Sequence, residues 1–283
     1  MQTPIELIAI DLDGTLLTDA KTLSQENIAA IEAAVALDKK VVICTGRTLP
    51  GVRRFIQQLP MHQSEQDEYL ILNNGAVTHR LPNLEIIHEA TLDHEALRQL
   101  MAIIPQSEAQ GARLVAFDQE HFFMVSQAAP TELVIADAKT LASEITAISF
   151  EEIMKIPRIY KAMIIAPSDV LDKIQSELPE TLADVTSVVR SQPIIIEFLP
   201  KDINKGVALK ALAQQLNIPR QAIMALGDQL NDYEMLDYAG LGVKMANGVD
   251  GIDAVTQATT ASNNDHGVAK AIKKYVLEPE NKI

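Results

Sequence analysis

The sequence has almost no cysteine, since Cys44 is the single one among 283 residues. An internal disulfide is therefore excluded, and with it the usual way in which small secreted domains are stabilised. The N-terminus also lacks the basic flank and the long apolar stretch of a signal peptide. We therefore expect a soluble protein of the reducing cytoplasm.

Long hydrophobic runs and basic charge are scarce as well. Apolar stretches such as AMIIA at 162–166 and PIIIEFL at 193–199 are far shorter than the about 20 residues of a membrane-spanning helix. The chain has 24 Lys and Arg against 38 Asp and Glu, a net charge of −14. We expect neither nucleic acid nor membrane as a partner, because both require a basic surface. An anionic substrate is still compatible, because a metal or a few lysines can reverse the local field.

The chain is long enough for two domains, and its 47% hydrophobic residues can build their cores. Apolar runs at 6–12, 41–45 and 69–76 are typical of strands buried on both faces. Between these strands, apolar residues at helical spacing predict helices at 24–40, where Ser24 is the expected N-cap, and at 49–59. This alternation predicts right-handed βαβ units and a parallel sheet.

The pattern changes after residue 82. Two strands without an intervening helix are expected at 112–126, and two more at 186–200. The alternation returns near residue 200, with a helix at 205–217 and a strand at 222–228. The sequence thus predicts an α/β protein with a Rossmann-like parallel-sheet core, residues 1–82 and 200–283, and an inserted α+β domain at 83–199.

Polar residues follow several predicted core strands directly. In an open parallel sheet, ligands bind beyond the carboxyl ends of the strands, so we expect these residues to converge. Carboxylates and a hydroxyl gathered there would suit Mg²⁺, which prefers oxygen ligands. The residues are Asp11, Asp13, Thr45, Gly46, Arg47, Asn73, Asn74, Asp228, Asn231 and Asp232.

Asp11 and Asp13 are two residues apart, so in extended chain both side chains point the same way. One carboxylate could attack phosphorus while the other handles the proton, which is a known form of covalent catalysis. Lys205, at the start of a helix, could supply a fixed positive charge, and Thr45 could donate a hydrogen bond. These groups cover what phosphoryl transfer requires.

Four segments, DLDGTLL, CTGR, NKG and GDQLND, occur in an order that resembles the four motifs of the haloacid dehalogenase (HAD) superfamily of phosphatases. The insert between the second and third motifs, NNGA before it and HGVAKAI near the end are similar to the Cof-type branch, in which the insert is a cap domain. The resemblance implies Asp11 as nucleophile, Asp13 as general acid/base and Lys205 as catalytic cation. It implies phosphate binding by Thr45 and Lys205 and Mg²⁺ binding by the Asp13 carbonyl and Asp228, with Asn231 and Asp232 at or just behind the metal and phosphate. We also expect Asp11 and Asp232 at the metal, and Leu12, Gly46, Arg47, Asn74 and Asn231 at the phosphate or substrate. The alternative for Arg47 and Asn74 is that they only orient the loop.

Several alternatives stay open at this point. Thr45 could be a helix-entry residue, Lys205 a surface lysine with Lys201 in its place, and Asp228 a helix cap. The expected activity is Mg²⁺-dependent hydrolysis of phosphomonoesters of small metabolites, sugar phosphates above all. A phosphosugar mutase is the alternative enzyme, and a phosphoaspartate signalling module is the alternative from another class. We expect a monomer or a weak homodimer, with the substrate chosen by the insert.

Overall fold

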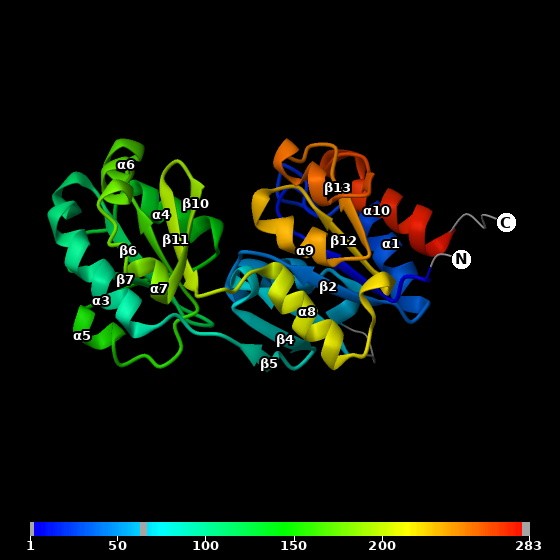
Figure 1. The fold of residues 1–283 in the computed structure, drawn as a ribbon, viewed down its shortest axis with the longest axis horizontal. Coiled ribbons are helices and arrows are strands. Elements are labelled where there is room, and N and C mark those ends of the chain that lie inside the picture. The colour runs from blue at the N-terminus through cyan, green and yellow to red at the C-terminus, as the bar shows by residue number, and fades with distance from the viewer. Residues whose placement is uncertain (1–2, 63–66, 279–283) are drawn as a thin grey trace. The chain divides into compact units, whose positions relative to one another are not determined.

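The computed structural model describes residues 3–62 and 67–278. By their contacts these residues form two compact units (Figure 1). Unit 1 falls within Met1–Gly46, Arg53–Glu89 and Asn204–Ile283, and unit 2 comprises Arg47–Val52 and Ala90–Ile203. No helix within the described ranges is long and apolar enough to cross a bilayer.

Unit 1 is built on a sheet with the strand order β14-β13-β12-β1-β2-β3-β4-β5. All neighbours from β14 to β3 pair parallel, and β3, β4 and β5 pair antiparallel. The strands are β1 (Leu7–Ile10), β2 (Lys40–Cys44), β3 (Glu68–Leu72), β4 (Val77–Leu81), β5 (Glu85–Glu89), β12 (Ile223–Gly227), β13 (Leu241–Lys244) and β14 (Ala258–Thr259).

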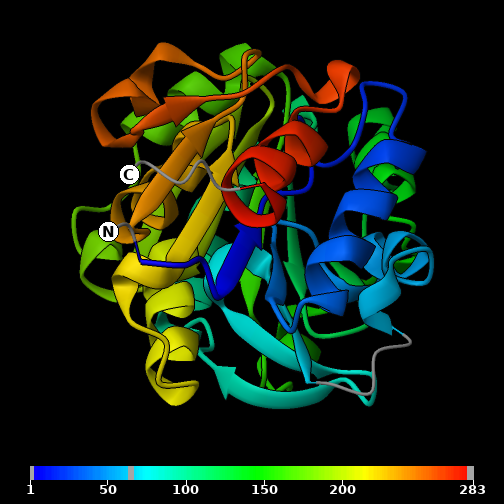
Figure 2. The same cartoon turned by 90° about the vertical axis from the view of Figure 1, so that its right-hand side faces the viewer.

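Helices cover both faces of this sheet. Figure 2 shows α1 (Gln25–Ala36) and α10 (Gly267–Ile272) on one face and α8 (Lys205–Gln215) on the other, where α9 (Tyr233–Tyr238) packs beside it. Because both faces are covered, every residue of β1 is buried. The other helical segments of unit 1 are Pro60–His62, Asn73–Gly75, Arg220–Ala222, Leu230–Asp232, Asp250–Val255, Asn263–Asp265 and Lys273–Leu277. Helix α2 (Leu49–Ile56) belongs to unit 2 up to Val52 and to unit 1 from Arg53.

Helix α1 begins as the sequence predicts but ends earlier. The Ser24 side chain accepts a hydrogen bond from the backbone N–H of Asn27, so Ser24 is the N-cap. The helix stops at Ala36, because Asp38 adopts a left-handed backbone conformation with φ 58°. The sequence predicts helix up to residue 40, but Lys39 lies beyond the end of α1 and Lys40 begins β2.

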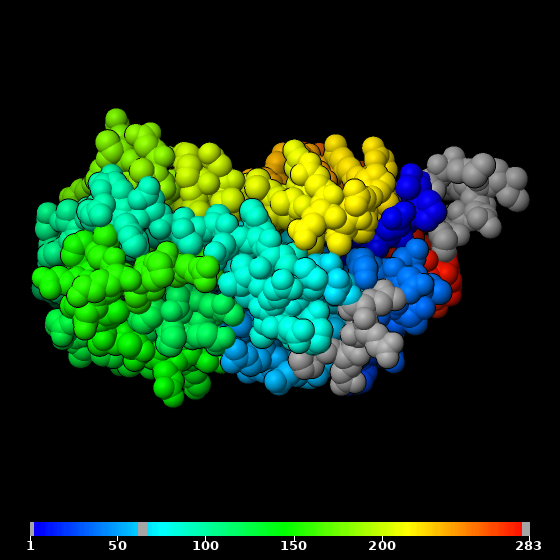
Figure 3. Space-filling model, turned by 90° about the horizontal axis from the view of Figure 1, so that it is seen from below, coloured from blue at the N-terminus to red at the C-terminus, as the bar shows by residue number. Residues whose placement is uncertain are grey.

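Strand β5 extends unit 1 past residue 82, to Glu89, by pairing with β4. It is the edge strand of the sheet and is only partly buried. Figure 3 shows this cyan part of the chain at the surface. Strands β4 and β5 form a hairpin with no helix between them, so their sequence pattern resembles that of the insert. The domain boundary predicted from the sequence, between residues 82 and 83, therefore falls within this hairpin.

Unit 2 is an α+β arrangement with the strand order β10-β11-β9-β6-β7-β8, in which only β7 and β8 pair parallel. Helices α3 and α6 pack on one face of this sheet and α4 on the other. The strands are β6 (Arg113–Phe117), β7 (Phe122–Val125), β8 (Ile145–Ile148), β9 (Lys161–Ile165), β10 (Thr186–Gln192) and β11 (Ile195–Pro200). The helices are α3 (His94–Ile103), α4 (Glu132–Thr140), α5 (Phe150–Ile153), α6 (Ser168–Ser176) and α7 (Leu182–Val185), with short turns at Ile104–Gln106 and Glu108–Gln110.

Candidate active site

The carboxyl ends of β1 and β12 bring two aspartates together in unit 1. The strands pair parallel with Ile10 opposite Leu226, so the residues that follow them leave the sheet at the same edge. Asp11 donates its backbone N–H to the Leu226 carbonyl at 3.0 Å, and Asp228 follows β12 after Gly227. Both aspartates are nearly buried, with 5% and 3% exposure, at the place where open parallel sheets bind ligands.

The turn after Asp11 is shaped around Asp228. Gly14 has a φ of +80°, and a Cβ added to it would lie 2.4 Å from Asp228 Oδ2. Thr15 donates its hydroxyl to Asp228 Oδ1 at 3.0 Å. The Gly-Thr pair of the first motif therefore allows the turn to approach this carboxylate and holds it in place.

Lys205 links Asp11 to Asp232. Its Nζ lies 2.6 Å from Asp11 Oδ1 and 2.7 Å from Asp232 Oδ1, and its side chain is fully buried. Asn204 caps α8 by accepting from the Val207 N–H, which places Lys205 at the first helical position. The rival Lys201 instead donates to the Ala183 carbonyl in unit 2. The structure thus brings Lys205, and not Lys201, to Asp11.

Asp232 also shapes the loop that carries Asp228. Its Oδ2 accepts the backbone N–H groups of Asp228 at 2.9 Å and of Gln229 at 3.1 Å. A Cβ on Gly227 would lie 2.6 Å from the Asp232 Cβ, so the loop can close only around glycine. Both Asp232 oxygens therefore accept hydrogen bonds within the protein.

The site carries more negative than positive charge. Burial raises the pKa of Asp11, the Asp232 and Asp228 charges raise it further, and Lys205 opposes them. Burial and Asp232 likewise raise the pKa of Asp228. Burial disfavours the charged form of Lys205, but the two carboxylates it contacts outweigh this and raise its pKa. One ammonium thus faces three carboxylates in a site shielded from water.

This charge excess fits a bound cation. One oxygen from each of Asp11, Asp228 and Asp232 lies within 4.8 Å of the others, and all three residues are buried. Buried carboxylates need such a partner, and oxygen donors of this kind suit a hard divalent ion. A cation would favour their ionised forms.

Thr45, Gly46, Asn74 and Asn231 also come together in unit 1. Asn74 donates its backbone N–H to the Thr45 carbonyl at 3.0 Å, and Asn231 Nδ2 donates to Asn74 Oδ1 at 3.1 Å. A Cβ on Gly46 would lie 2.9 Å from Asn74 Oδ1. The second and fourth motifs are therefore joined through Asn74, which has a left-handed backbone with φ 55°.

Three other residues that the sequence places in the site, Leu12, Asp13 and Arg47, make contacts of other kinds. Leu12 is fully buried, and its carbonyl accepts from the N–H groups of Leu16 and Leu17. Asp13 has a side chain exposed by 36%, and its carboxylate pairs with Lys21 at 2.8 Å. Arg47 is nearly buried and groups with unit 2, where its guanidinium donates to the carbonyl oxygens of Gly51 and Thr140.

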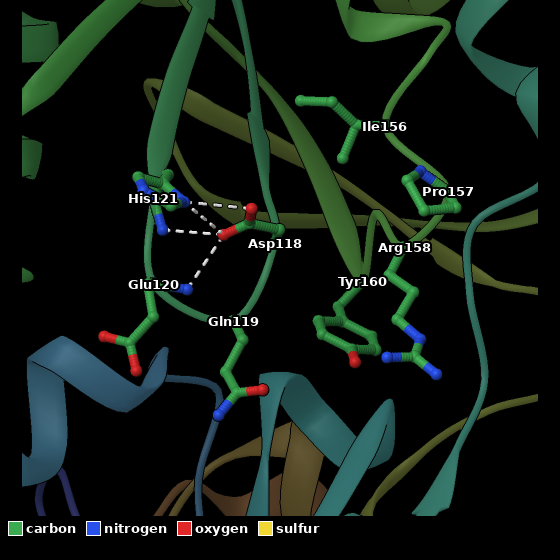
Figure 4. Close-up of a pocket in the computed structure, with 8 residues that line it drawn as sticks. All are labelled: Asp118, Gln119, Glu120, His121, Ile156, Pro157, Arg158 and Tyr160. Carbon is green, nitrogen blue, oxygen red and sulfur yellow. Dashed lines mark hydrogen bonds and ion pairs between the residues drawn. The ribbon is translucent and has the colours of Figure 1, made fainter.

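Unit 2 contains a pocket of about 240 Å³. It lies between the turn that joins β6 to β7 and the segment before β9. Figure 4 shows the Gln119, Arg158 and Tyr160 side chains extending to the same side, while His121 turns toward Asp118. The lining residues are Asp118, Gln119, Glu120, His121, Ile156, Pro157, Arg158 and Tyr160.

The sequence does not indicate that Arg158 and Tyr160 line the pocket or that Lys21 contacts Asp13. No sequence pattern distinguishes an arginine or tyrosine that lines a pocket from any other in a loop. Lys21 lies in a turn whose fold brings it back to Asp13, which no periodicity predicts.

The chain matches the family model described as haloacid dehalogenase-like hydrolase over residues 8–272. It is 33% identical over 277 residues to the YxeH protein of Bacillus subtilis, covering 96% of this chain and 98% of that one. It is 29% identical over 287 residues to the 5-amino-6-(5-phospho-D-ribitylamino)uracil phosphatase YitU of the same organism, covering 97% and 99%.

A solved haloacid dehalogenase-like hydrolase from Bacteroides thetaiotaomicron has the same fold. It superimposes with a TM-score of 0.85 at 25% identity, covering 95% of this chain and 98% of that one. The predicted fold class, a Rossmann-like core with an inserted α+β part, is thereby confirmed.

Proposed function

We propose that this chain, which belongs to the haloacid dehalogenase-like hydrolase family and is a phosphatase, hydrolyses phosphomonoesters of small metabolites. The reaction uses Mg²⁺ and passes through an aspartyl-phosphate at Asp11. The observation that carries the proposal is the buried contact of Lys205 with Asp11 and Asp232, next to Asp228. The groups that we propose as nucleophile, fixed cation and metal ligands thus lie close together.

In the first step an Asp11 carboxylate oxygen attacks phosphorus, and the bond from phosphorus to the leaving oxygen breaks. Asp13 gives its proton to that oxygen, so the product leaves as an alcohol. Lys205 holds the Asp11 carboxylate in place and offsets negative charge on the phosphoryl oxygens. Thr45, Gly46, Asn74 and Asn231, with the backbone at Leu12, would bind these oxygens.

In the second step a water oxygen attacks phosphorus, and its proton passes to the Asp13 carboxylate. The bond between phosphorus and the Asp11 oxygen breaks, which releases inorganic phosphate and restores Asp11. Mg²⁺ would be held by Asp11, Asp228 and the Asp13 carbonyl, with Asp232 as a further candidate, and when bound it neutralises charge on the transferring group.

The substrate class that we favour is sugar phosphates or similar polyol phosphates. The name of the relative YitU specifies a substrate with a phosphorylated ribityl chain. The pocket of unit 2 offers carboxylate, amide, guanidinium and phenol groups, which can hydrogen-bond hydroxyl groups of a leaving group. We propose that unit 2, as the cap, selects the substrate in this way, and that Arg47 takes part in it.

We further propose that the protein acts in the cytoplasm as a monomer or weak homodimer. Its net charge of −14 argues against nucleic acid or anionic membrane as partners.

The test is phosphate release from a panel of sugar phosphates, polyol phosphates and nucleotides, with EDTA and then with added Mg²⁺. We expect release that stops with chelator and returns with Mg²⁺, and none from Asp11→Asn. Asp169→Asn changes an exposed carboxylate of α6 and is the matched control. Chelator-resistant release or an active Asp11→Asn protein would contradict the proposal. Phosphate returned to a second hydroxyl of the sugar would favour the mutase.

A further inference from the structure

Lys21 lies outside every motif, yet its ammonium contacts the Asp13 carboxylate. Lys21 Nζ donates to Asp13 Oδ1 at 2.8 Å, and the two side chains are exposed by 45% and 36%. Pairs as exposed as this contribute little to stability, so stability does not explain why the chain forms it. The geometry of the turn that carries Lys21 instead indicates a role for this contact in the reaction.

The turn is held by hydrogen bonds within residues 18–22. Lys21 donates its N–H to the Thr18 carbonyl at 2.8 Å, Thr18 donates its N–H to the Thr22 carbonyl at 3.0 Å, and the two threonine hydroxyls lie 2.8 Å apart. Lys21 itself adopts a left-handed backbone with φ 55°, which is unfavourable for a residue with a side chain. Such conformations persist where the surrounding structure holds them, and they occur often at functional sites.

Two asparagines near the C-terminal end of unit 1 fix the same turn. Asn263 Nδ2 donates to the Leu17 carbonyl at 2.9 Å and to Asp19 Oδ1 at 3.0 Å. Asn264 Nδ2 donates to Asp19 Oδ2 at 2.8 Å. These bonds lower the pKa of Asp19, which keeps its carboxylate ionised and bound. Because the turn is fixed from both sides, Lys21 reaches Asp13 without first ordering a loose loop.

We infer that Lys21 is a positioning residue for Asp13 in the second step of the reaction. Its ammonium holds the Asp13 carboxylate where that carboxylate takes the proton from the attacking water. The inference rests on the proposed function, in which Asp13 is that base. Asp13 is also the acid of the first step, but p-nitrophenolate is a leaving group that departs without receiving a proton. With p-nitrophenyl phosphate, removal of Lys21 therefore slows the loss of the aspartyl-phosphate and leaves its formation and substrate binding unchanged.

The test is rapid-quench kinetics with ³²P-labelled p-nitrophenyl phosphate and Mg²⁺, measuring the formation and decay of protein-bound phosphate. Lys21→Asn removes the charge but suits the left-handed backbone, and Lys21→Arg keeps a cation. Lys273→Asn, which removes an exposed lysine 3.8 Å from Glu278, is the matched control. For Lys21→Asn we expect decay to slow roughly two- to fivefold at unchanged formation rate and KM, the range of an exposed ion pair. Lys21→Arg should restore most of the rate.

Decay of Lys21→Asn at the wild-type rate would overturn the inference and leave the phosphatase proposal intact. A raised KM with normal decay would overturn it too, because Lys21 would then bind substrate. If wild-type protein forms no bound phosphate at all, the proposed role of Asp11 fails and the inference fails with it.

Discussion

Lys205 in unit 1 and Lys161 in unit 2 are both buried beside carboxylates, and the two clusters are built differently. In unit 1, Lys205 is fully buried and contacts both Asp11 and Asp232 at 2.6–2.7 Å. In unit 2, Lys161 is 3% exposed and lies 3.3 Å from Glu197, with its ammonium 5.2 Å from the centre of the Phe117 ring. A buried lysine with acidic neighbours therefore does not by itself identify a site of chemistry.

The surroundings distinguish the two clusters. Around Lys205, glycines, backbone N–H groups and the Thr15 hydroxyl hold Asp228 and Asp232 in place at the carboxyl ends of parallel strands. Around Lys161, the neighbouring Asp137 on α4 has a buried Oδ2 without a hydrogen-bond partner among the described residues. The first cluster lies at the edge where open parallel sheets bind ligands, whereas the second lies against the apolar core under α4.

The largest expected effect separates the two lysines. Lys205→Met should lower kcat for p-nitrophenyl phosphate by roughly 10²–10³-fold, because the transferring group loses a preorganised charge. Lys161→Met should leave kcat within about twofold, yet lower the free energy of unfolding by about 3 kcal/mol, since Glu197 loses its partner. Steady-state kinetics and urea unfolding of both variants measure this. A comparable loss of kcat in Lys161→Met would mean that the distinction is wrong.

The parallel arrangement of β1 and β12 could be foreseen, because runs buried on both faces alternate with helical spacing. That alternation was enough to expect Asp11 and Asp228 at one edge of a sheet. The choice between Lys205 and Lys201 could not be made from sequence, because both follow the same strand. It depends on where α8 begins, and the Asn204 cap decides this.

Long-range and irregular features gave less signal. Arg47 follows the second core strand directly, but its hydrogen bonds go to carbonyl groups of unit 2, 4 and 93 residues away along the chain. Strand β8 and helix α5 are too short for periodicity to mark them. The contact between Lys21 and Asp13 depends on a turn held by Asn263, 242 residues further along the chain than Lys21, which local patterns do not contain.

A smaller effect concerns the pocket of unit 2. Arg158→Ala should raise KM for the best sugar phosphate by about tenfold, the scale of one hydrogen bond to a charged group, and leave p-nitrophenyl phosphate turnover unchanged. Arg98→Ala removes an exposed arginine of α3 outside the pocket and is the control. Equal changes for both substrates would show that Arg158 supports the fold of unit 2 and does not select the leaving group.

The smallest effect tests how the unit 2 cluster responds to pH. Burial raises the pKa of Asp137 to about 6, against the opposing charge of Lys161 and with help from Glu197. Since the folded-state pKa lies above the unfolded value of 3.8, the contribution of Asp137 to stability is complete below that value and is lost as pH rises through about 6. Asp137→Asn removes this loss. We expect the variant to gain about 1–2 kcal/mol in unfolding free energy relative to wild type between pH 4 and pH 8, a range reduced because the residue is only half-buried.

Urea unfolding of wild type and Asp137→Asn at a series of pH values measures this difference, and the titrations that both proteins share cancel in it. Asp169→Asn, which changes an exposed carboxylate of the same unit, should show a nearly constant difference from wild type over the same range. A constant difference for Asp137→Asn as well would mean that its carboxylate reaches water and that the unit 2 cluster is not a buried one. Phosphatase activity is not needed for this measurement, so it tests the contrast between the two lysines separately from the proposed reaction.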